Sequence, residues 1–409
     1  MSGRFEIDLR ARTVTRYSPS GAAASFPLPP GVWEQSTSIE RLCFSPGVSE
    51  LHVGLPGGEE AAVELRRDTD SAEELLDGRP ILYLDQNKWS SMAAWKFGHR
   101  EVLAEEAQAA QQLAALVENR QILLPISAAH LVETTPLHGE RRIALASTVL
   151  QLGRGWQMRN PLHVRVEEMA LGLRGQRPVA GDVFAPHADA FFSYQPESPI
   201  ENLPGPWAEL AAAIPGVLGL YDAIVDAEAI PDEGGVAAAA AACWAKKHAE
   251  LAAQLRAEGA DKHLTRRVVH GHLLLDMADD LLRLSQTLNL DADEIMRRLT
   301  VAEDPVGQMP FLAQLRQMLF ARVRNAEQRW ESSDLIDTLF LSCAAGYADV
   351  VVGEKNAVGY LRQAQNPPSK ATLTASLSEA VSLLSASDGS APALNRARAD
   401  RDTNSALCL

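Results

Sequence analysis

Two patterns of apolar and polar residues predict two kinds of β-strand in this chain. Apolar and polar positions alternate in residues 5–9, 51–55 and 62–65, which is typical of strands with one buried and one solvated face. Short, mainly apolar runs occupy residues 81–84, 122–127 and 350–352, which is typical of strands covered on both faces. The chain is therefore predicted to contain a small antiparallel β-unit near its N-terminus and a separate, buried sheet.

Helical periodicity accounts for most of the remaining residues. Amphipathic spacing predicts helices over 102–118, 127–135 and 332–346, with Ser127 as the N-cap of the second, and residues 206–323 are almost wholly helical in pattern. A final strand is predicted at 371–375 and a short helix at 376–384. Because strands and helices alternate on either side of the long helical stretch, the buried strands are expected to be parallel neighbours in one sheet.

These elements predict an α/β fold in four parts. A small β-rich unit takes residues 1–68, and a core with a central parallel sheet takes residues 79–170 and 326–388. Residues 171–325 are interpreted as a large, mainly helical insertion that begins with a loop rich in Pro and Gly. Residues 389–409 lack periodicity and are expected to form a disordered tail.

Composition adds bounds on location and partners. No apolar run approaches the roughly 20 residues of a membrane helix, and the N-terminus has no signal-peptide core, so a cytoplasmic protein without membrane contact is expected. The formal net charge of −15 argues against broad nonspecific binding to nucleic acid but leaves room for a local basic groove. Cys43, Cys243, Cys343 and Cys408 show no paired spacing and are expected to be free thiols.

Acidic residues follow the predicted buried strands at the points where ligands bind in α/β proteins. Asp85 comes directly after the run 81–84, and Glu354 follows the run 350–352, whereas Asp349 precedes that run. Glu133 lies one helical turn beyond His130. An isolated acid at the end of a strand can equally be a simple helix cap, so the significance of Asp85 depends on these companions.

Two further acids share the first turn of the helix predicted at 332–346. Asp334 and Asp337 are three residues apart and so lie on one face. Carboxylates gathered at one edge of a sheet repel one another unless a cation neutralises them, and oxygen ligands of this kind select Mg²⁺ or Mn²⁺. Such an ion assists phosphodiester hydrolysis, which indicates a nuclease.

This order of motifs resembles the PIN-domain superfamily of ribonucleases, in particular its divergent bacterial PIN-like branches. The likeness rests on Asp-x-Asn after a buried strand, Ser-x-x-His-x-x-Glu on a helix, and Asp-x-x-Asp followed by Tyr-x-Asp-Val-Val-Val-x-Glu-Lys. It implies a three-layer α/β/α sandwich and metal-dependent cleavage of RNA. It also implies that Mg²⁺ or Mn²⁺ is held by Asp85, Glu133, Asp334, Asp337 and Glu354, that all of these except Asp334 are catalytic, and that Asn87 and His130 support the site.

Several functions stay open under this resemblance. The first is an endoribonuclease acting in RNA turnover, defence or toxin-like growth arrest, with a protein regulator or antitoxin as a further partner. The second is a catalytically inactive PIN-fold module that binds RNA or a protein. The third is a nuclease that prefers structured DNA. No sequence feature separates RNA from DNA as the substrate.

Two other groups of residues have both a functional and an ordinary interpretation. The region from Arg141 to Arg174 is the richest in arginine, and Arg141 and Arg142 are candidate contacts to a nucleic-acid backbone, although a solvated basic helix face is the commoner explanation. A second group can suggest metal ligands, but polar residues along an amphipathic helix are the favoured interpretation because nothing supplies the missing ligands. This group comprises His263, His270, His272, Asp276, Asp279 and Asp280.

Overall fold

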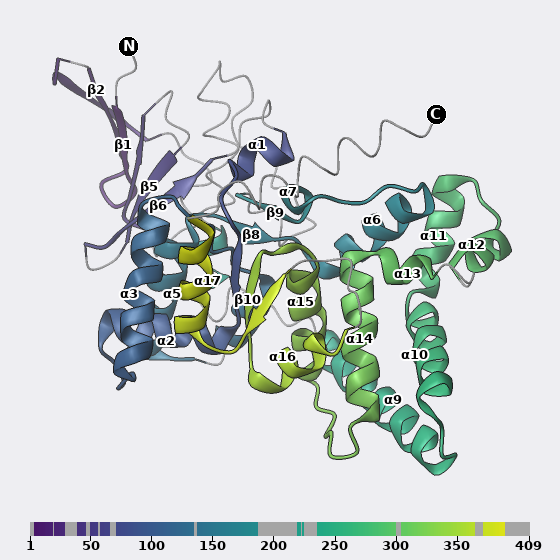
Figure 1. The fold of residues 1–409 in the computed structure, drawn as a ribbon. Helices are drawn as coiled ribbons and strands as arrows, with labels where there is room; N and C mark the ends of the chain where they lie inside the picture. The colour runs from purple at the N-terminus through teal and green to yellow at the C-terminus, as the bar shows by residue number, and fades with distance from the viewer. Residues whose placement is uncertain are drawn as a thin grey trace.

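The computed structural model is a mixed α/β structure in which helices predominate (Figure 1). It describes residues 4–18, 20–28, 39–45, 50–55, 58–65, 71–134, 137–186, 219–221, 223–224, 235–299, 304–364 and 371–388. The predicted tail, Cys408 and the greater part of the loop predicted at 175–215 lie outside these residues. Within them, none of the helices has the length and apolar character needed to cross a membrane.

The N-terminal residues form a six-stranded antiparallel sheet in the order β3-β2-β1-β4-β5-β6. Its strands are β1 (Arg4–Asp8), β2 (Thr13–Tyr17), β3 (Ala23–Pro27), β4 (Arg41–Phe44), β5 (Glu50–Gly54) and β6 (Glu60–Glu64). The predicted alternation is present in β6, where Ala61 and Val63 are buried and Glu60 is exposed. The buried face packs on the helices that follow, so this sheet shares a hydrophobic core with the rest of the chain.

A second sheet contains the buried strands predicted at 81–84, 350–352 and 371–375. Strands β7 (Leu82–Leu84), β10 (Val350–Val352) and β11 (Thr372–Thr374) form a three-stranded sheet in the order β11-β10-β7. Both pairings are parallel, with Val350 opposite Leu82 and Val352 opposite Leu84. The parallel order expected from the sequence is confirmed, and the carboxyl ends of β7 and β10 lie side by side.

The strand predicted at 122–127 is not formed over its length. Leu123 makes an isolated parallel bridge to Ile81, and Ile126 makes another to Gln157 in β8 (Gln157–Met158). Pro125 lies between the two bridging residues and has no N–H to donate to a ladder, which accounts for the interruption. The segment still continues the sheet beyond β7, and β8 pairs in turn with β9 (Phe184–Ala185).

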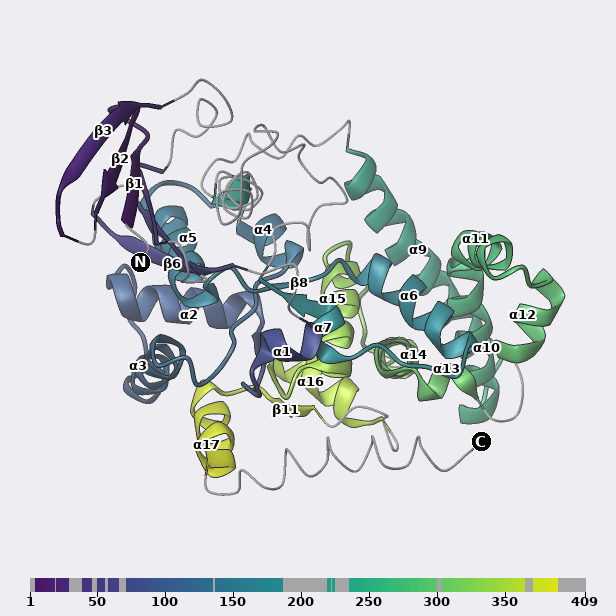
Figure 2. The same cartoon turned by 90° about the horizontal axis from the view of Figure 1, so that it is seen from above.

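Helices cover both faces of the parallel sheet. Leu82, Leu84 and Val352 face one hydrophobic core, whereas Tyr83 and Val351 face the other, as the period-two alternation of a strand requires. The first core is covered by α2 (Gln86–Phe97), α3 (Ala104–Glu118), α5 (Gly139–Gly153) and α17 (Leu377–Asp388), and the second by α6 (Pro161–Leu173), α14 (Pro310–Arg324) and α15 (Asp334–Tyr347) (Figures 1 and 2).

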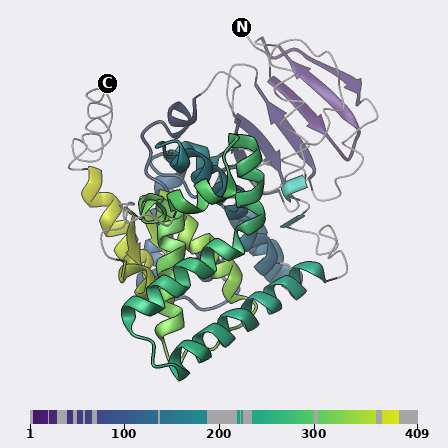
Figure 3. The same ribbon diagram turned by 90° about the vertical axis from the view of Figure 1, so that its right-hand side faces the viewer.

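The long helical stretch extends outward from the second core (Figure 3). It includes α9 (Val236–Ala257), α10 (Lys262–Asp276), α11 (Ala278–Leu288), α12 (Ala292–Leu299) and α13 (Pro305–Gln308). Short helices elsewhere in the described residues include α1 (Ala72–Leu76), α4 (Ala128–Thr134), α7 (Ala180–Val183) and α16 (Lys355–Arg362).

Helix α14 belongs to the predicted insertion but packs closely against α15. A Cβ at Gly346 would lie 2.8 Å from the backbone nitrogen of Phe311, so glycine permits this close approach. The buried carboxylate of Glu168 accepts hydrogen bonds from the N–H groups of Phe311 and Leu312 at 2.8 and 2.9 Å and so caps α14. This helix is therefore an integral part of the layer that carries Asp337.

Candidate functional site

Asp85 lies at the carboxyl end of β7 and begins helix α2. Its N–H donates to the carbonyl of Val352 at 2.9 Å, and its Oδ1 accepts a hydrogen bond from the N–H of Gln86 at 2.9 Å. The side chain is therefore the N-cap of α2, as the ordinary interpretation of this residue expects. The backbone N–H of Glu354 also hydrogen-bonds this carboxylate and lowers its pKa, so residues that follow both β7 and β10 orient the side chain.

His130 fixes the helix that carries Glu133 to the end of β7. The N–H of Ser127 donates to His130 Nδ1 at 2.9 Å, and His130 Nε2 therefore carries the proton and donates to the carbonyl of Leu84 at 2.8 Å. Burial lowers the pKa of His130 to about 4, so the imidazole is neutral. Tyr83 stacks on this ring with centroids 5.4 Å apart and shares a hydrogen bond of 2.9 Å with Ser127 Oγ.

These contacts give the supporting role predicted for His130 a specific structural basis. The sequence did not predict that Tyr83 would contact His130 and Ser127. Tyr83 occupies the middle of an apolar run, where an aromatic residue reads as ordinary core. The available signal was the hydroxyl of Tyr83, because a hydroxyl in a strand buried on both faces needs a hydrogen-bond partner.

Asp337 lies on the first turn of α15 and faces Asp85 and Glu133. One carboxylate oxygen from each of these residues lies within 4.8 Å of the other two. The three residues come from α15, the end of β7 and α4, and the structure brings them together as the sequence predicted.

Asp334 is occupied by a different partner. Its carboxylate forms an ion pair with Arg322 of α14, and Arg322 also donates to Thr338 Oγ1 at 2.8 Å. The side chain of Arg322 is only 8 % exposed, so Asp334 neutralises a buried cation. The structure therefore places Asp334 outside the group formed by the other three acids, although the sequence predicted that it would join them.

Glu354 and Asp349 lie at opposite ends of β10. Glu354 follows the strand on the side of Asp85, and its Oε1 accepts a hydrogen bond from Asn87 Nδ2 at 2.5 Å. Asp349 precedes the strand, where its Oδ2 accepts from the N–H of Ile81 at 2.8 Å. Asn87 therefore supports Glu354 at the open rim of the site, while Asp349 contacts the opposite end of the sheet.

Burial and mutual repulsion raise the pKa values of the clustered acids. Desolvation is the main cause for each, and the neighbouring carboxylates add to it. The pKa of Asp85 rises to about 6, that of Asp337 to about 7 and that of Glu133 to about 8. The folded chain alone does not balance the negative charge that these residues carry at neutral and alkaline pH.

The cluster has the ligand chemistry that a divalent cation requires. Carboxylate oxygens suit Mg²⁺ and Mn²⁺, and small rotations of the side chains bring oxygens less than 4.8 Å apart to the spacing of about 3 Å found around an octahedral ion. Asp85 is 9 % exposed at the floor, Glu133 and Asp337 are half-buried, and Glu354 is exposed at the rim. An ion on the floor would thus face solvent through the side of Glu354.

The structure corrects the prediction that Arg142 contacts a nucleic-acid backbone. Arg142 is 5 % exposed and donates from Nε to the carbonyl of Ile224 at 2.8 Å, so its guanidinium lies inside the protein. Arg141 is exposed and stays a candidate. Other arginines of this region form ion pairs within the chain, namely Arg154 with Glu50 and Glu64, Arg159 with Glu167, and Arg165 with Asp280.

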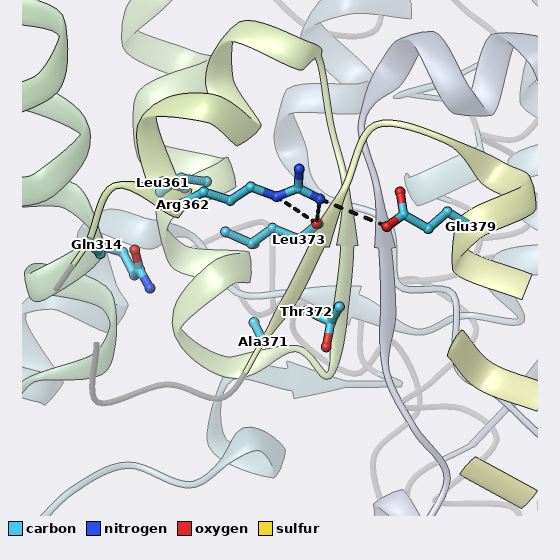
Figure 4. A pocket seen from close by; sticks show the side chains of 8 residues that line it. Gln314, Leu361, Arg362, Ala371, Thr372, Leu373 and Glu379 are labelled. Atoms are coloured by element: carbon cyan, nitrogen blue, oxygen red, sulfur yellow. Dashed lines mark hydrogen bonds and ion pairs between the residues drawn. The ribbon is translucent and has the colours of Figure 1, made fainter. Parts of the chain in front are cut away.

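A pocket of about 390 Å³ lies apart from the acids, at the outer edge of β11 (Figure 4). Arg362 crosses it, donating from Nε to the carbonyl of Leu373 at 3.1 Å and approaching Glu379 at 4.0 Å. The guanidinium of Arg362 thus binds the backbone of the edge strand β11. The pocket contains none of the residues of the acidic cluster.

No family model, curated protein or solved structure matches this chain at a significant level.

Proposed function

We propose that this protein is a divalent-metal-dependent endoribonuclease built on a PIN-like core. The observation that carries the proposal is the convergence of Asp85, Glu133 and Asp337 at the carboxyl edge of a parallel sheet, with oxygens within 4.8 Å of one another. Glu354 adds negative charge at the rim of the same edge, because it contributes to the raised pKa of each of these three acids. The sheet with helices on both faces is compatible with a three-layer PIN-like arrangement.

Asp85, Glu133 and Asp337 would hold Mg²⁺ or Mn²⁺. A bound ion of this kind polarises a phosphodiester and lowers the pKa of an attacking water. The chain supplies the rigidity of the ligands. The backbone N–H of Asp85 donates to Val352 and its carboxylate accepts from the N–H of Gln86, which fixes the first acid. Neutral His130 holds α4 against the end of β7 so that Glu133 faces the cluster.

Glu354 has a different role because it is exposed and held by Asn87 Nδ2. It borders the open side of the cluster, where a phosphodiester of the substrate would enter. A carboxylate at that place would repel a phosphate in the absence of a cation and would favour a cation at the cluster, so productive binding would depend on the metal held by Asp85, Glu133 and Asp337.

Cleavage of labelled RNA and DNA tests the proposal. The wild-type chain is expected to cut single-stranded RNA with Mn²⁺ and to be inactive with EDTA, and Asp85→Asn is expected to lose cleavage at least a hundredfold. Asp349→Asn is a matched control, because it also changes an acid next to a strand of this sheet but at the opposite end. Cleavage of DNA but not of RNA would show that DNA is the substrate. Cleavage without Mn²⁺, or full activity of Asp85→Asn, would refute the proposed site.

A further inference from the structure

Two histidines on neighbouring helices leave buried ring nitrogens without a hydrogen bond. His248 lies on α9 and is 1 % exposed, and His272 lies on α10 with its ring 5.1 Å from that of His248 between centroids. The Nε2 atoms of both residues are buried and have no hydrogen-bond partner among the described residues. Buried polar atoms are nearly always satisfied, so two such atoms close together indicate a missing ligand.

A carboxylate completes this cluster. Asp276 lies one turn beyond His272 on α10, and one ligand atom from each of His248, His272 and Asp276 lies within 4.8 Å of the other two. Ligands on a tetrahedral zinc ion are about 3.3 Å apart, which small side-chain rotations would reach. Two imidazoles and one carboxylate form a set that favours zinc and related transition metals over Mg²⁺.

The histidine on α9 is already oriented for coordination. His248 Nδ1 donates to the carbonyl of Trp244 at 2.9 Å, which directs the lone pair to Nε2. In most metal-binding histidines the nitrogen that does not bind the metal donates such a hydrogen bond, which fixes the tautomer and the plane of the ring. Trp330 stacks on the ring of His248 at 5.2 Å between centroids and limits its rotation.

We propose that His248, His272 and Asp276 form a second metal site, selective for Zn²⁺ or a similar transition-metal ion, with water in the remaining position. This site is independent of the proposed nuclease function. Its role is structural, since it would fasten α9 to α10. It lies beside Trp330, over which Arg322 is placed at 5.3 Å, and Arg322 in turn pairs with Asp334 of α15.

The sequence suggested only part of this cluster. His272 and Asp276 belonged to a group of possible metal ligands, but the favoured interpretation was ordinary polar residues because further ligands were missing. The structure supplies His248 from the preceding helix. The other members of that group are not part of this trio. His270 contacts Arg316 at 3.3 Å and Asp280 pairs with Arg165, whereas His263 and Asp279 are exposed, as Asp276 also is.

Titration of the full-length chain with Co²⁺ and Zn²⁺ tests the site. The Asp85→Asn/Asp337→Asn double variant serves as the background, because it removes carboxylates of the acidic cluster that also bind cations. We expect one equivalent of Zn²⁺ to bind in calorimetry, a Co²⁺ spectrum with the intense visible bands of four or five ligands, and a higher melting temperature with Zn²⁺.

Substitutions with matched controls identify the ligands. His272→Gln and Asp276→Asn, made separately in that background, are each expected to weaken Zn²⁺ binding at least tenfold and to abolish the rise in melting temperature. His263→Gln and Asp279→Asn change exposed residues of the same types and should bind as the background does. Absence of bound Zn²⁺, equal affinity in all four variants, or a weak six-coordinate Co²⁺ spectrum would overturn the proposal.

Discussion

Asp337 and Asp334 share one helical turn, yet their replacement by asparagine should change stability in opposite directions. Without metal, the pKa of Asp337 is about 7 against 3.8 for the unperturbed group, so the folded chain disfavours its ionised form. A difference of about 3 in pKa corresponds to about 4 kcal/mol of destabilisation once both states are ionised. Asp337→Asn removes this cost, whereas Asp334→Asn leaves the buried guanidinium of Arg322 without its carboxylate.

The sign of the pH dependence follows from the raised pKa of Asp337. Near pH 4 the folded carboxyl holds its proton and the cost is nearly absent, and the cost grows as the pH rises towards 7. It amounts to about 1.5 kcal/mol at pH 5 and about 4 kcal/mol at pH 8.5. Burial of the asparagine amide costs the same at both pH values, so the gain of Asp337→Asn should be about 2.5 kcal/mol larger at pH 8.5.

Urea denaturation in EDTA measures this difference. The midpoint of Asp337→Asn should exceed that of the wild type, and by more at pH 8.5 than at pH 5. Asp334→Asn should unfold at lower urea at both pH values, with a loss of about 3 kcal/mol as expected for a broken buried ion pair. Excess Mn²⁺ should stabilise the wild type and Asp334→Asn but much less Asp337→Asn. A lower midpoint for Asp337→Asn at pH 8.5, or the same gain at both pH values, would refute the reasoning.

Further predictions concern the rim, the surface and the packing of α14. Glu354→Gln should lower cleavage about tenfold or more, because it removes negative charge that would help to attract the metal ion to the cluster. Asp349→Asn should keep the wild-type rate and lose stability. Equal cleavage rates of Glu354→Gln and the wild type would contradict the prediction for Glu354. Arg141→Gln should reduce the slope of log affinity against log salt by about 1 in RNA-binding titrations, and an unchanged slope would leave Arg141 an ordinary surface residue. Gly346→Ala should lower the melting temperature by several degrees because its Cβ would meet the backbone of Phe311, so wild-type melting would contradict the close packing.

Local signals in the sequence were sufficient to find the acidic cluster. Asp85 and Glu354 each follow an uninterrupted apolar run, and Asp337 lies in a first helical turn, so the positions of these acids depend on short-range patterns. The parallel direction of β10 followed from the connection rule, and it separated Glu354 from Asp349 correctly. A crossover connection returns the chain to the starting end of the sheet, so the next strand runs parallel and its carboxyl end meets that of its neighbour.

Features set by tertiary packing were not predictable in the same way. Arg142 belongs to an arginine-rich stretch, and only the helix packing shows that its side chain points inward to Ile224. Asp334 looked equivalent to Asp337 because α14, which supplies Arg322, was assigned to an insertion and not to the layer beside α15. The Ala-rich sequence of α9 likewise gives no sign of which face meets α10, so His248 could not be joined to His272.

The central position of β10 has a consequence for the synthesis of this protein. β10 lies between β7 and β11 in the sheet. The N–H of Ile81, just before β7, donates to the side chain of Asp349, just before β10, and these two residues are 268 positions apart in the chain. At about 5–20 residues per second, a ribosome needs roughly 15–50 s to make that length, and during this time β7 has no strand partner from the C-terminal part. Asp337 and Glu354 emerge equally late. A nascent chain therefore cannot assemble the acidic site until the ribosome has passed Glu354, which would keep the proposed nuclease inactive during the earlier part of translation, beside the messenger RNA that encodes it.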